Sequence, residues 1–417
     1  MTEQQASDTC FDAAALQPGE RPEGIPKWLV RVIALGCGLM AANIYYAQPL
    51  VELISASLGL PREASGLVVT CSQIGYGVGL AFVVPLGDLI ENRRLVIATS
   101  SIAIVALVVA ALAPNAAIYL IAAVFIGLGS VTVQILVPYA AHLSPESTRG
   151  HVVGSVTSGL MLGIMMARPL ASFIADLLSW HAVFLASAAA VLALVILMRA
   201  ALPPRQPEHE LSYGQLMKSM ITLVRTSDIL RRRAIYQGCL FGSFTAFWTT
   251  VPMHLTQQFH FSQTQIGLFA LVGVSGVFTA PIAGRLADRG LTRPATNAAF
   301  ATAMVAFLLC LIAQHGSVFA LGLLVAAAIA LDAGTAGNLV LGQRAIYALD
   351  PAHRSRLNGI YIAILFVGGA LASALSVWIY AALGWSAACL FSLSLPLCAF
   401  AYHLTERDTG TPSKAAA

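Results

Sequence analysis

Charged side chains are scarce in this sequence. Only 10% of its 417 residues are Asp, Glu, Lys or Arg, whereas 58% are hydrophobic, and the mean hydropathy is +0.79. A soluble protein carries about 25% charged residues. The shortage of charge excludes a water-soluble domain, because no soluble core could hide this much apolar surface. Lipid must therefore be the solvent for most of the chain.

Several chemical signatures are missing as well. The seven cysteines are scattered, with neither metal-ligand spacing nor pairing logic, so we interpret them as small apolar residues. There is no Walker lysine motif, metal cluster or nucleotide-binding domain, which leaves ATP-driven transport unsupported. Residues 1–26 are polar and contain no apolar signal-peptide core, so the first apolar run, from Trp28, is expected to serve as the insertion signal.

Long apolar runs are what the sequence has in abundance. At about 20 residues for each span, the chain is long enough for about twelve transmembrane helices. Tight connections such as Ser179-Trp180 and Gly384 suit helical hairpins. The expected spans lie at 28–50, 64–86, 95–113, 116–140, 151–178, 181–202, 234–256, 265–287, 295–313, 317–342, 356–383 and 385–404.

A short charged pattern occurs once in each half of the chain. Residues 85–94 read PLGDLIENRR and residues 284–293 read GRLADRGLTR, about 200 residues later, and each lies between two apolar runs. Residues 143–154 and 349–359 also resemble one another. The sequence therefore predicts an all-α membrane fold of twelve transmembrane helices, in two six-helix bundles related by pseudo-two-fold symmetry.

The expected domains follow from these segments. An amphipathic pattern between the sixth and seventh spans predicts an interfacial helix that tethers the two halves, with a plain solvated linker as the alternative. The predicted divisions are a disordered cytoplasmic tail at 1–26, an N-terminal bundle at 27–202, a cytoplasmic linker at 203–233, a C-terminal bundle at 234–404 and a second cytoplasmic tail at 405–417.

The distribution of positive charge predicts the orientation. With the N-terminus in the cytoplasm, all of the 23 lysines and arginines except Arg62 and Arg168 fall in cytoplasmic segments. This distribution follows the positive-inside rule. We expect an integral protein of the plasma (inner) membrane with both termini in the cytoplasm.

Twelve spans, a long central loop and paired loop motifs together resemble the major facilitator superfamily, over nearly the whole chain. The family's loop motif has the form G-x-x-x-D-R-x-G-R-R/K, and Gly284, Asp288 and Arg289 match it in the second copy. Residues 43–50, NIYYAQPL, are similar to the twelve-span drug:proton antiporter branch. The resemblance implies alternating access and proton-coupled efflux of small lipophilic or weakly polar molecules.

In this family the loop motif is thought to be a latch that holds the two halves together at the cytoplasmic side and breaks during transport. The resemblance assigns this role to acidic and basic groups in each half. The alternative is a topology signal in a solvated turn, which explains the arginines but not an aspartate at the same place in both halves. The candidate latch residues are Asp88, Arg93, Arg285, Asp288 and Arg289.

Two full charges are expected near the middle of the membrane. Arg168 stands where the antiporter motif of helix 5 has a glycine before its proline, and Asp332 lies within the tenth span. An arginine at a helix centre costs about 2.5–3.5 kcal/mol, so it should face a cavity or a partner. The arginine usual in helix 4 of this branch is replaced by Ala123. We expect Arg168 and Asp332 to bind substrate or couple protons; the alternative is a static structural pair.

Further cavity candidates come from spans 1, 4, 7 and 10, which line the cavity in this family. Aromatic and amide side chains at helical spacing suit a lipophilic or weakly polar substrate, although ordinary helix packing explains the same pattern. Small-residue stripes that include Gly75 and Gly368 predict close helix contacts at the interface between the halves. The candidate lining residues are Asn43, Tyr46, Gln134, Gln237, Phe244 and Trp248.

Other functions stay open as alternatives. Residues 273–276 match the short Gly-x-Ser-Gly motif of membrane serine proteases, but the histidines lie near span ends or in loops, so no enzyme is expected. A sensor that does not transport, or an exporter or importer of a sugar, amino acid or other small metabolite, is also compatible with the sequence. The expected partners are a small-molecule substrate, protons and the lipid bilayer, with no cofactor, metal or nucleic acid, and the protein is expected to be a monomer.

Overall fold

The computed structural model describes residues 26–206, 212–350 and 354–406. Most of the two predicted tails and part of the predicted linker lie outside these ranges. Within them the secondary structure consists of helices, and no strand occurs. The prediction of an all-α fold is confirmed.

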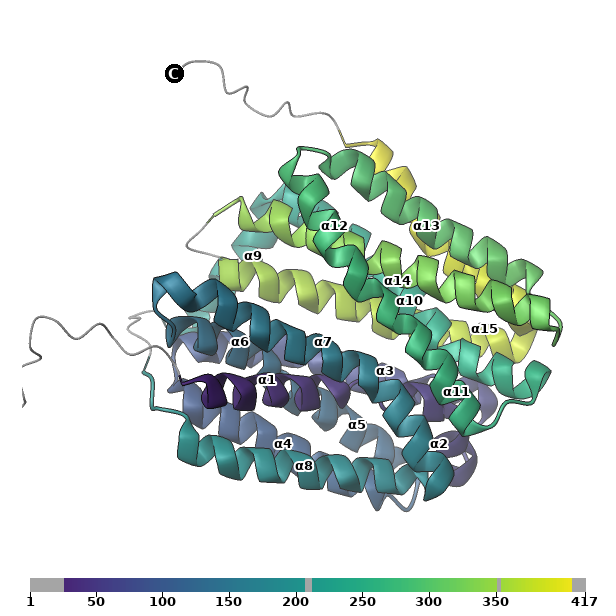
Figure 1. Ribbon diagram of the computed structural model, residues 1–417, viewed down its shortest axis with the longest axis horizontal. Helices are drawn as coiled ribbons and strands as arrows, with labels where there is room; N and C mark the ends of the chain where they lie inside the picture. The colour runs from purple at the N-terminus through teal and green to yellow at the C-terminus, as the bar shows by residue number, and fades with distance from the viewer. Residues whose placement is uncertain (1–25, 207–211, 351–353, 407–417) are drawn as a thin grey trace, which may run out of the picture.

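The N-terminal half runs from α1 to α8 and is drawn from purple to teal in Figure 1. Its first expected span is broken, because α1 ends at Ala42 and a turn at 43–47 leads into a short 3-10 helix, η1. The elements are α1 (Lys27–Ala42), η1 (Gln48–Leu50), α2 (Val51–Leu58), η2 (Arg62–Ala64), α3 (Leu67–Phe82), η3 (Val84–Asp88), α4 (Asn92–Ala111), α5 (Ala116–Ser130), α6 (Thr132–His142), α7 (Glu146–Leu177) and α8 (Trp180–Ala201).

The C-terminal half follows a separate helix, α9 (Tyr213–Thr226), which lies within the predicted linker. α10 begins at Asp228, earlier than the expected start at 234, because the Ser227 side chain caps it by accepting a hydrogen bond from the backbone N–H of Leu230. The elements are α10 (Asp228–Phe259), α11 (Gln263–Ala270), η4 (Leu271–Ser275), α12 (Gly276–Asp288), α13 (Thr292–Ile312), α14 (Val318–Tyr347) and α15 (Arg354–Leu404).

Side-chain caps also begin the helices that follow the tight turns. Oδ1 of Asn115 accepts a hydrogen bond from the backbone N–H of Ile118 at 3.1 Å, and Ser179 and Ser317 cap α8 and α14 in the same way. Such caps satisfy N–H groups that a helix start leaves unpaired, and each stabilises the fold by about 1 kcal/mol. The polar residues in these turns thus decide where three helices start.

Nine helical segments in the described ranges are long and apolar enough to cross a membrane. One of them includes most of α15, which covers two expected spans. Gly384 bends this helix with φ 82° and ψ −175°, a conformation that glycine adopts without steric cost. The chain is an integral membrane protein by this criterion, while the count of twelve spans stays a prediction.

The two halves repeat the same helix pairings. α1 packs on α7 so closely that a Cβ atom added to Gly163 would lie 2.1 Å from the carbonyl oxygen of Gly38. α10 packs on α15 in the same manner, and a Cβ atom on Gly368 would lie 2.4 Å from the carbonyl oxygen of Gly238. The pairs α3–α5 and α12–α14 also correspond. Packing is therefore duplicated at residues about 200 positions apart, as for a parallel repeat.

The small-residue stripes serve contacts inside each half. Gly75 of α3 faces α5, where a Cβ atom would lie 1.8 Å from the carbonyl oxygen of Val124, and Gly368 faces α10. The expectation that these two glycines lie at the interface between the halves is wrong. Backbones approach most closely within the bundles, and glycine is the residue that such an approach requires.

The halves themselves meet from the middle of the molecule to one end. We call the end where α1 begins and α15 ends the terminal end, and the opposite end, with α2 and α11, the distal end. The terminal end lies toward the left and top of Figure 1, and the distal end toward the lower right. α3 packs on α15, and α7 packs on α11. Thr70 donates to the carbonyl oxygen of Ala370 at 3.2 Å, and Nε2 of Gln257 donates to Oε1 of Glu52 at 3.1 Å. The distal end is therefore closed.

At the terminal end, α9 connects the halves. The Tyr213 hydroxyl donates to the carbonyl oxygen of Phe82 in the N-terminal half at 3.0 Å. Nη1 of Arg356, in α15, donates to the Ser219 hydroxyl at 3.1 Å. A helix with a polar and an apolar face can hold both bundles at the membrane surface.

Candidate functional site

Arg168 lies in the second half of α7 and is only 3% exposed. Its Nε donates a hydrogen bond to Oε1 of Gln48 in η1 at 2.7 Å. Three ring centroids surround its guanidinium carbon, those of Trp248 at 4.5 Å, Tyr45 at 5.1 Å and Phe244 at 5.3 Å. The rings come from both halves, so Arg168 holds its charge at their junction.

The aromatic rings make this buried charge tolerable without a direct ion pair. Each cation–π contact contributes about 0.5–2 kcal/mol. Together they offset the cost of about 2.5–3.5 kcal/mol for an arginine at a helix centre. Nη2 of Arg168 is nevertheless buried with no hydrogen-bond partner among the described residues. An unpaired buried donor costs about 1–3 kcal/mol, so this nitrogen marks a position for an acceptor.

Asp332 lies on α14 and is 4% exposed. Its Oδ1 accepts a hydrogen bond from Nε1 of Trp248 at 3.0 Å. Its Oδ2 lies beside Gly273 of η4, where an added Cβ atom would come within 2.9 Å of it. Gly276 likewise packs against the backbone of Asp332, at 3.3 Å from an added Cβ atom to the carbonyl oxygen. Gly273 therefore leaves room for the carboxylate, and Gly276 leaves room for the backbone of the same residue.

Trp248 connects the two charged residues. Its ring lies over the guanidinium of Arg168, and its N–H binds the carboxylate of Asp332. Arg168 belongs to the N-terminal half and Asp332 to the C-terminal half, and no direct ion pair joins them in the part of the chain that the structure describes. A change of charge at either residue therefore acts on the same indole and on the same junction of the halves.

Two broken helices frame this site. The first span leaves the α-helical conformation at 43–47, which brings Tyr45 and Gln48 against Arg168. The eighth span changes to a 3-10 helix at η4, beside Asp332. Irregular backbone at membrane depth is tolerated where protein buries it or where it lines a cavity. Both breaks thus belong to the site.

A small cavity adjoins Arg168 on its distal side. Apolar side chains of α10 and α11, together with Pro49 and Trp248, form most of its wall. Its volume is about 10 Å³, which has room for about one water molecule. This cavity therefore admits no molecule larger than water.

The remaining lining candidates take part in neighbouring hydrogen bonds. Nε2 of Gln134, on α6, donates to the Tyr76 hydroxyl at 3.2 Å. Nε2 of Gln237 donates to the carbonyl oxygen of Thr335 at 3.2 Å, and its Oε1 accepts from Nδ2 of Asn338 at 2.7 Å. Neither glutamine bonds to the two central charges among the described residues, so both lie beside the Arg168–Asp332 site.

Asn43 and Tyr46 contact α8. The Ser187 hydroxyl donates to Oδ1 of Asn43 at 2.6 Å, and Tyr46 lies beside the same serine. Tyr45, between them, is the residue whose ring faces Arg168. Regular helical spacing could not identify it, because the turn at 43–47 changes the direction of successive side chains.

Gly273 is the other site residue that sequence reasoning missed. It appeared in the Gly-x-Ser-Gly pattern, where the serine attracted attention. The structure gives the glycine a packing role, because Asp332 and Trp248 occupy the space that a side chain would need. A small residue near an intramembrane carboxylate could have been the signal, but only the fold pairs η4 with α14.

The first copy of the loop motif bonds within its own half and to the chain that follows. Nη2 of Arg93 donates to the carbonyl oxygen of Arg199, and Nη1 of Arg205 donates to Oδ1 of Asn92 at 3.0 Å. The side chain of Asp88, at the end of η3, forms no hydrogen bond or ion pair within the described ranges. This copy does not join the two halves here.

The second copy is likewise internal to its half. Asp288 forms an ion pair with Arg344 of α14, and Nη1 of Arg344 also donates to the carbonyl oxygen of Gly284 at 2.8 Å. Arg285 and Arg289 form no side-chain hydrogen bond or ion pair in the part of the chain described. Any latch between the halves would thus require another conformation.

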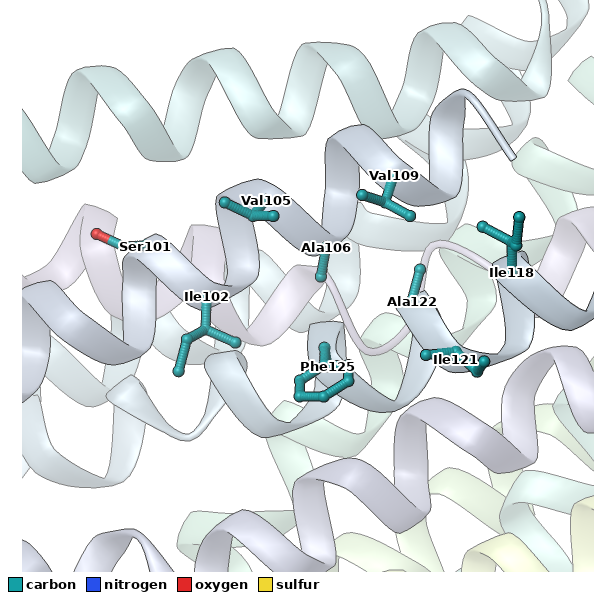
Figure 2. A pocket seen from close by; sticks show the side chains of 9 residues that line it. All are labelled: Ser101, Ile102, Val105, Ala106, Val109, Ile118, Ile121, Ala122 and Phe125. Atoms are coloured by element: carbon teal, nitrogen blue, oxygen red, sulfur yellow. The ribbon is translucent and has the colours of Figure 1, made fainter. Parts of the chain in front are cut away.

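A larger apolar groove lies elsewhere, between α4 and α5 on the outside of the N-terminal half (Figure 2). It measures about 530 Å³ and is lined by side chains such as Val105, Ile121 and Phe125, which are exposed. Lipid tails are as apolar as these side chains. The groove therefore matches a lipid-facing surface, and the charged groups of the candidate site do not contribute to it.

An all-helical membrane protein with two similar halves and opposite charges buried at their junction has the construction of a membrane transporter. The Major Facilitator Superfamily profile matches residues 33–313 and 233–417. The chain belongs to this family. Because the family consists of transporters, the expectation that the protein is not an enzyme is confirmed.

Individual relatives agree with this assignment. The uncharacterized transporter YgaY of Escherichia coli O157:H7 is 35% identical over 373 residues, which cover 88% of this chain and 93% of the relative. The probable transporter SCO4007 of Streptomyces coelicolor is 32% identical over 388 residues, 91% of this chain and 88% of the relative. The solved structure of the nucleoside transporter NupG has a TM-score of 0.74 at 14% identity, over 91% of this chain and 100% of that one.

Proposed function

We propose that this protein is a proton-coupled secondary active transporter in which Asp332 binds the proton. The observation that carries the proposal is the carboxylate buried at the junction of the halves and bonded to Trp248, whose ring also contacts Arg168. Protonation there changes the charge balance between the halves. A transporter needs such a change to bias one conformation over another.

The first candidate activity is efflux of small lipophilic or weakly polar molecules in exchange for protons. The likeness of residues 43–50 to the drug:proton antiporter branch supports this direction. The rings of Tyr45, Phe244 and Trp248 supply an apolar surface for such a molecule. Proton and substrate would then occupy the site in turn.

Alternating access would open the distal and terminal ends one at a time. We propose that the terminal end faces the cytoplasm of a plasma (inner) membrane, because the lysines and arginines gather there. The distal end, which is closed here, would then face the outside of the cell. In the opposite state, Asp88 and Arg93 with Arg285, Asp288 and Arg289 would form the latch between the halves.

Transport in inside-out vesicles with an imposed pH gradient, across a panel of compounds, tests the proposal. Asp332→Asn should abolish gradient-driven transport while leaving exchange without a gradient. Asp228→Asn, which removes a carboxylate from the exposed start of α10, is the matched control and should transport normally. Full coupled transport by Asp332→Asn would refute the role of this carboxylate. Binding without any flux of any compound would favour a sensor.

A second candidate activity is cotransport of a small metabolite with protons. The unpaired Nη2 of Arg168 favours it, because a neutral lipophilic drug offers no strong acceptor to this nitrogen. The same vesicles separate the candidates, since cotransport moves substrate with the proton and exchange moves it against the proton.

A further inference from the structure

We propose that Arg168 recognises the carboxylate of a small organic acid with an apolar or aromatic body, and that this anion binds together with the proton. The proposal rests on the proton-coupled transport through Arg168 and Asp332 proposed above, and it names the substrate class of that site. It selects cotransport over exchange.

Two unpaired donors point to a carboxylate. Nη2 of Arg168 and Nε2 of Gln48 are both buried, and neither has a hydrogen-bond partner among the described residues. They are adjacent, because Oε1 of the same Gln48 amide accepts from Nε of Arg168 at 2.7 Å. Two neighbouring N–H donors and a fixed positive charge match a group with two oxygens and one negative charge.

The surroundings define the rest of the molecule. Rings of Tyr45, Phe244 and Trp248 surround the guanidinium, and the cavity beside it is walled by apolar side chains of α10 and α11. These surfaces can bury an apolar or aromatic body but offer no partners for the hydroxyl groups of a sugar. A monocarboxylate also matches the single positive charge better than a doubly charged phosphate does.

The charges of the site decide the sign of the coupling. Arg168 keeps its charge at any relevant pH, so the site has one positive group and one carboxylate that can be neutralised. With Asp332 ionised, a bound anion would place two negative charges around one arginine in a medium where charge is costly. When a proton adds to the Asp332 carboxylate, only the substrate carboxylate faces Arg168. Each therefore strengthens the binding of the other.

No other charged group described near this carboxylate competes for the proton. Asp332 is faced by Trp248 from α10, by Gly273 from η4 and by Arg168 from α7. Tyr45 faces Arg168 on its other side and carries no charge as a phenol. Proton binding at the junction thus falls to Asp332.

Binding of three probes of similar size tests the proposal with the purified full-length protein. Benzoate, benzamide and benzylamine are compared between pH 6 and 8, together with proton uptake on binding. Benzoate should bind at least about tenfold more tightly than benzamide, and its affinity should rise as the pH falls. Wild-type protein should take up protons when benzoate binds. Asp332→Asn should bind benzoate without proton uptake and without the pH dependence.

Arginine variants provide the controls. Arg168→Gln should lose the preference for benzoate, and Arg168→Lys, which keeps the charge but not the planar fork, should restore part of it. Arg149→Gln removes an exposed arginine from the start of the same helix and should bind benzoate normally. Thermal unfolding of each variant separates lost binding from lost folding, and the lysine variant and Asp332→Asn keep the test valid if Arg168→Gln does not fold.

Distinct results would overturn the proposal. A preference for benzylamine would make Asp332 the recognition group, and equal binding of benzoate and benzamide would remove the carboxylate from recognition. Absence of proton uptake in the wild type would refute joint binding. If benzoate binds as expected but no proton-coupled flux occurs, the proposed function fails and the substrate class stands. If a neutral compound shows proton-coupled flux and benzoate does not bind, the proposed function stands and the substrate class fails.

Discussion

Gly273 offers the sharpest test of the geometry around Asp332. A Cβ atom at this position would lie 2.9 Å from Oδ2 of Asp332 and 3.0 Å from Cζ2 of Trp248, whereas ordinary contacts begin at 3.4 Å. The backbone does not have a positive φ, so alanine is strained only by lack of space. Gly273→Ala should therefore push the carboxylate and the indole away by about 0.5 Å and break their 3.0 Å hydrogen bond.

The size of the effect follows from these contacts. Overpacking costs about 1–3 kcal/mol of stability. Losing a hydrogen bond to a charged group costs about 1.5–3 kcal/mol. If the loss of this hydrogen bond raises the free-energy barrier of the conformational change by the same amount, proton-driven transport should fall about 10- to 100-fold. Each factor of ten in rate corresponds to about 1.4 kcal/mol.

Initial rates in vesicles with an imposed pH gradient, together with thermal unfolding in detergent, measure both effects. Gly322→Ala is the matched control on α14, because nothing lies within 4 Å of its added Cβ atom. It should transport at the wild-type rate and be slightly stabilised, since alanine favours a helix over glycine. If Gly273→Ala transports at the wild-type rate and unfolds at the wild-type temperature, the close approach of Gly273 to Asp332 does not matter for function.

Three further predictions concern the indole, the chain end and the distal closure. Trp248→Phe keeps a ring over Arg168 but removes the hydrogen-bond donor to Asp332. Proton-driven transport should therefore fall about tenfold, whereas substrate binding measured without a pH gradient should change less. A hydrogen bond from His403 and the positive charge of Arg233 hold the pKa of Glu406 at about 2, against 4.5 for a free side chain. Its stabilising effect should be present above pH 4.5 and disappear as the pH falls toward 2, so the unfolding temperatures of wild type and Glu406→Gln should converge only in acid. Gln257→Ala removes the hydrogen bond to Glu52 across the distal end. The fraction of molecules open at that end should therefore rise about two- to tenfold. Spin-label distances between the halves measure this fraction, and an unchanged distance distribution would contradict the prediction.

Part of the candidate site could be predicted because intramembrane charge is rare. Arg168 and Asp332 stood out from apolar surroundings, and helical spacing added Phe244 and Trp248, both of which contact Arg168. Their roles in binding and coupling are still predictions. Asn43 and Tyr46 contact α8 here, and their role in lining the cavity stays a prediction. A turn interrupts the helix at 43–47, and spacing rules apply only to a continuous helix.

The latch residues show a second limit of sequence reasoning. Asp88 and Asp288 occupy matching positions in the two copies of the loop motif, and the sequence shows this directly. The partner of Asp288 is Arg344 on α14, a residue that no motif connects with it. Such pairs depend on which helices are neighbours and on which end of the molecule is closed. A repeated loop motif therefore indicates duplication more directly than it indicates contacts.

The sequence by itself determined the solvent, the helical architecture and the duplication of this protein. These follow from local composition, since apolar runs must satisfy their backbone groups internally within lipid. Tertiary structure alone decided that Trp248 lies between Arg168 and Asp332, that Gln48 and Tyr45 complete the surroundings of the arginine, and that Gly273 admits the carboxylate. Those contacts join residues from helices far apart in the chain and from both halves. They depend on helix breaks and on the docking of two bundles, which no local pattern contains.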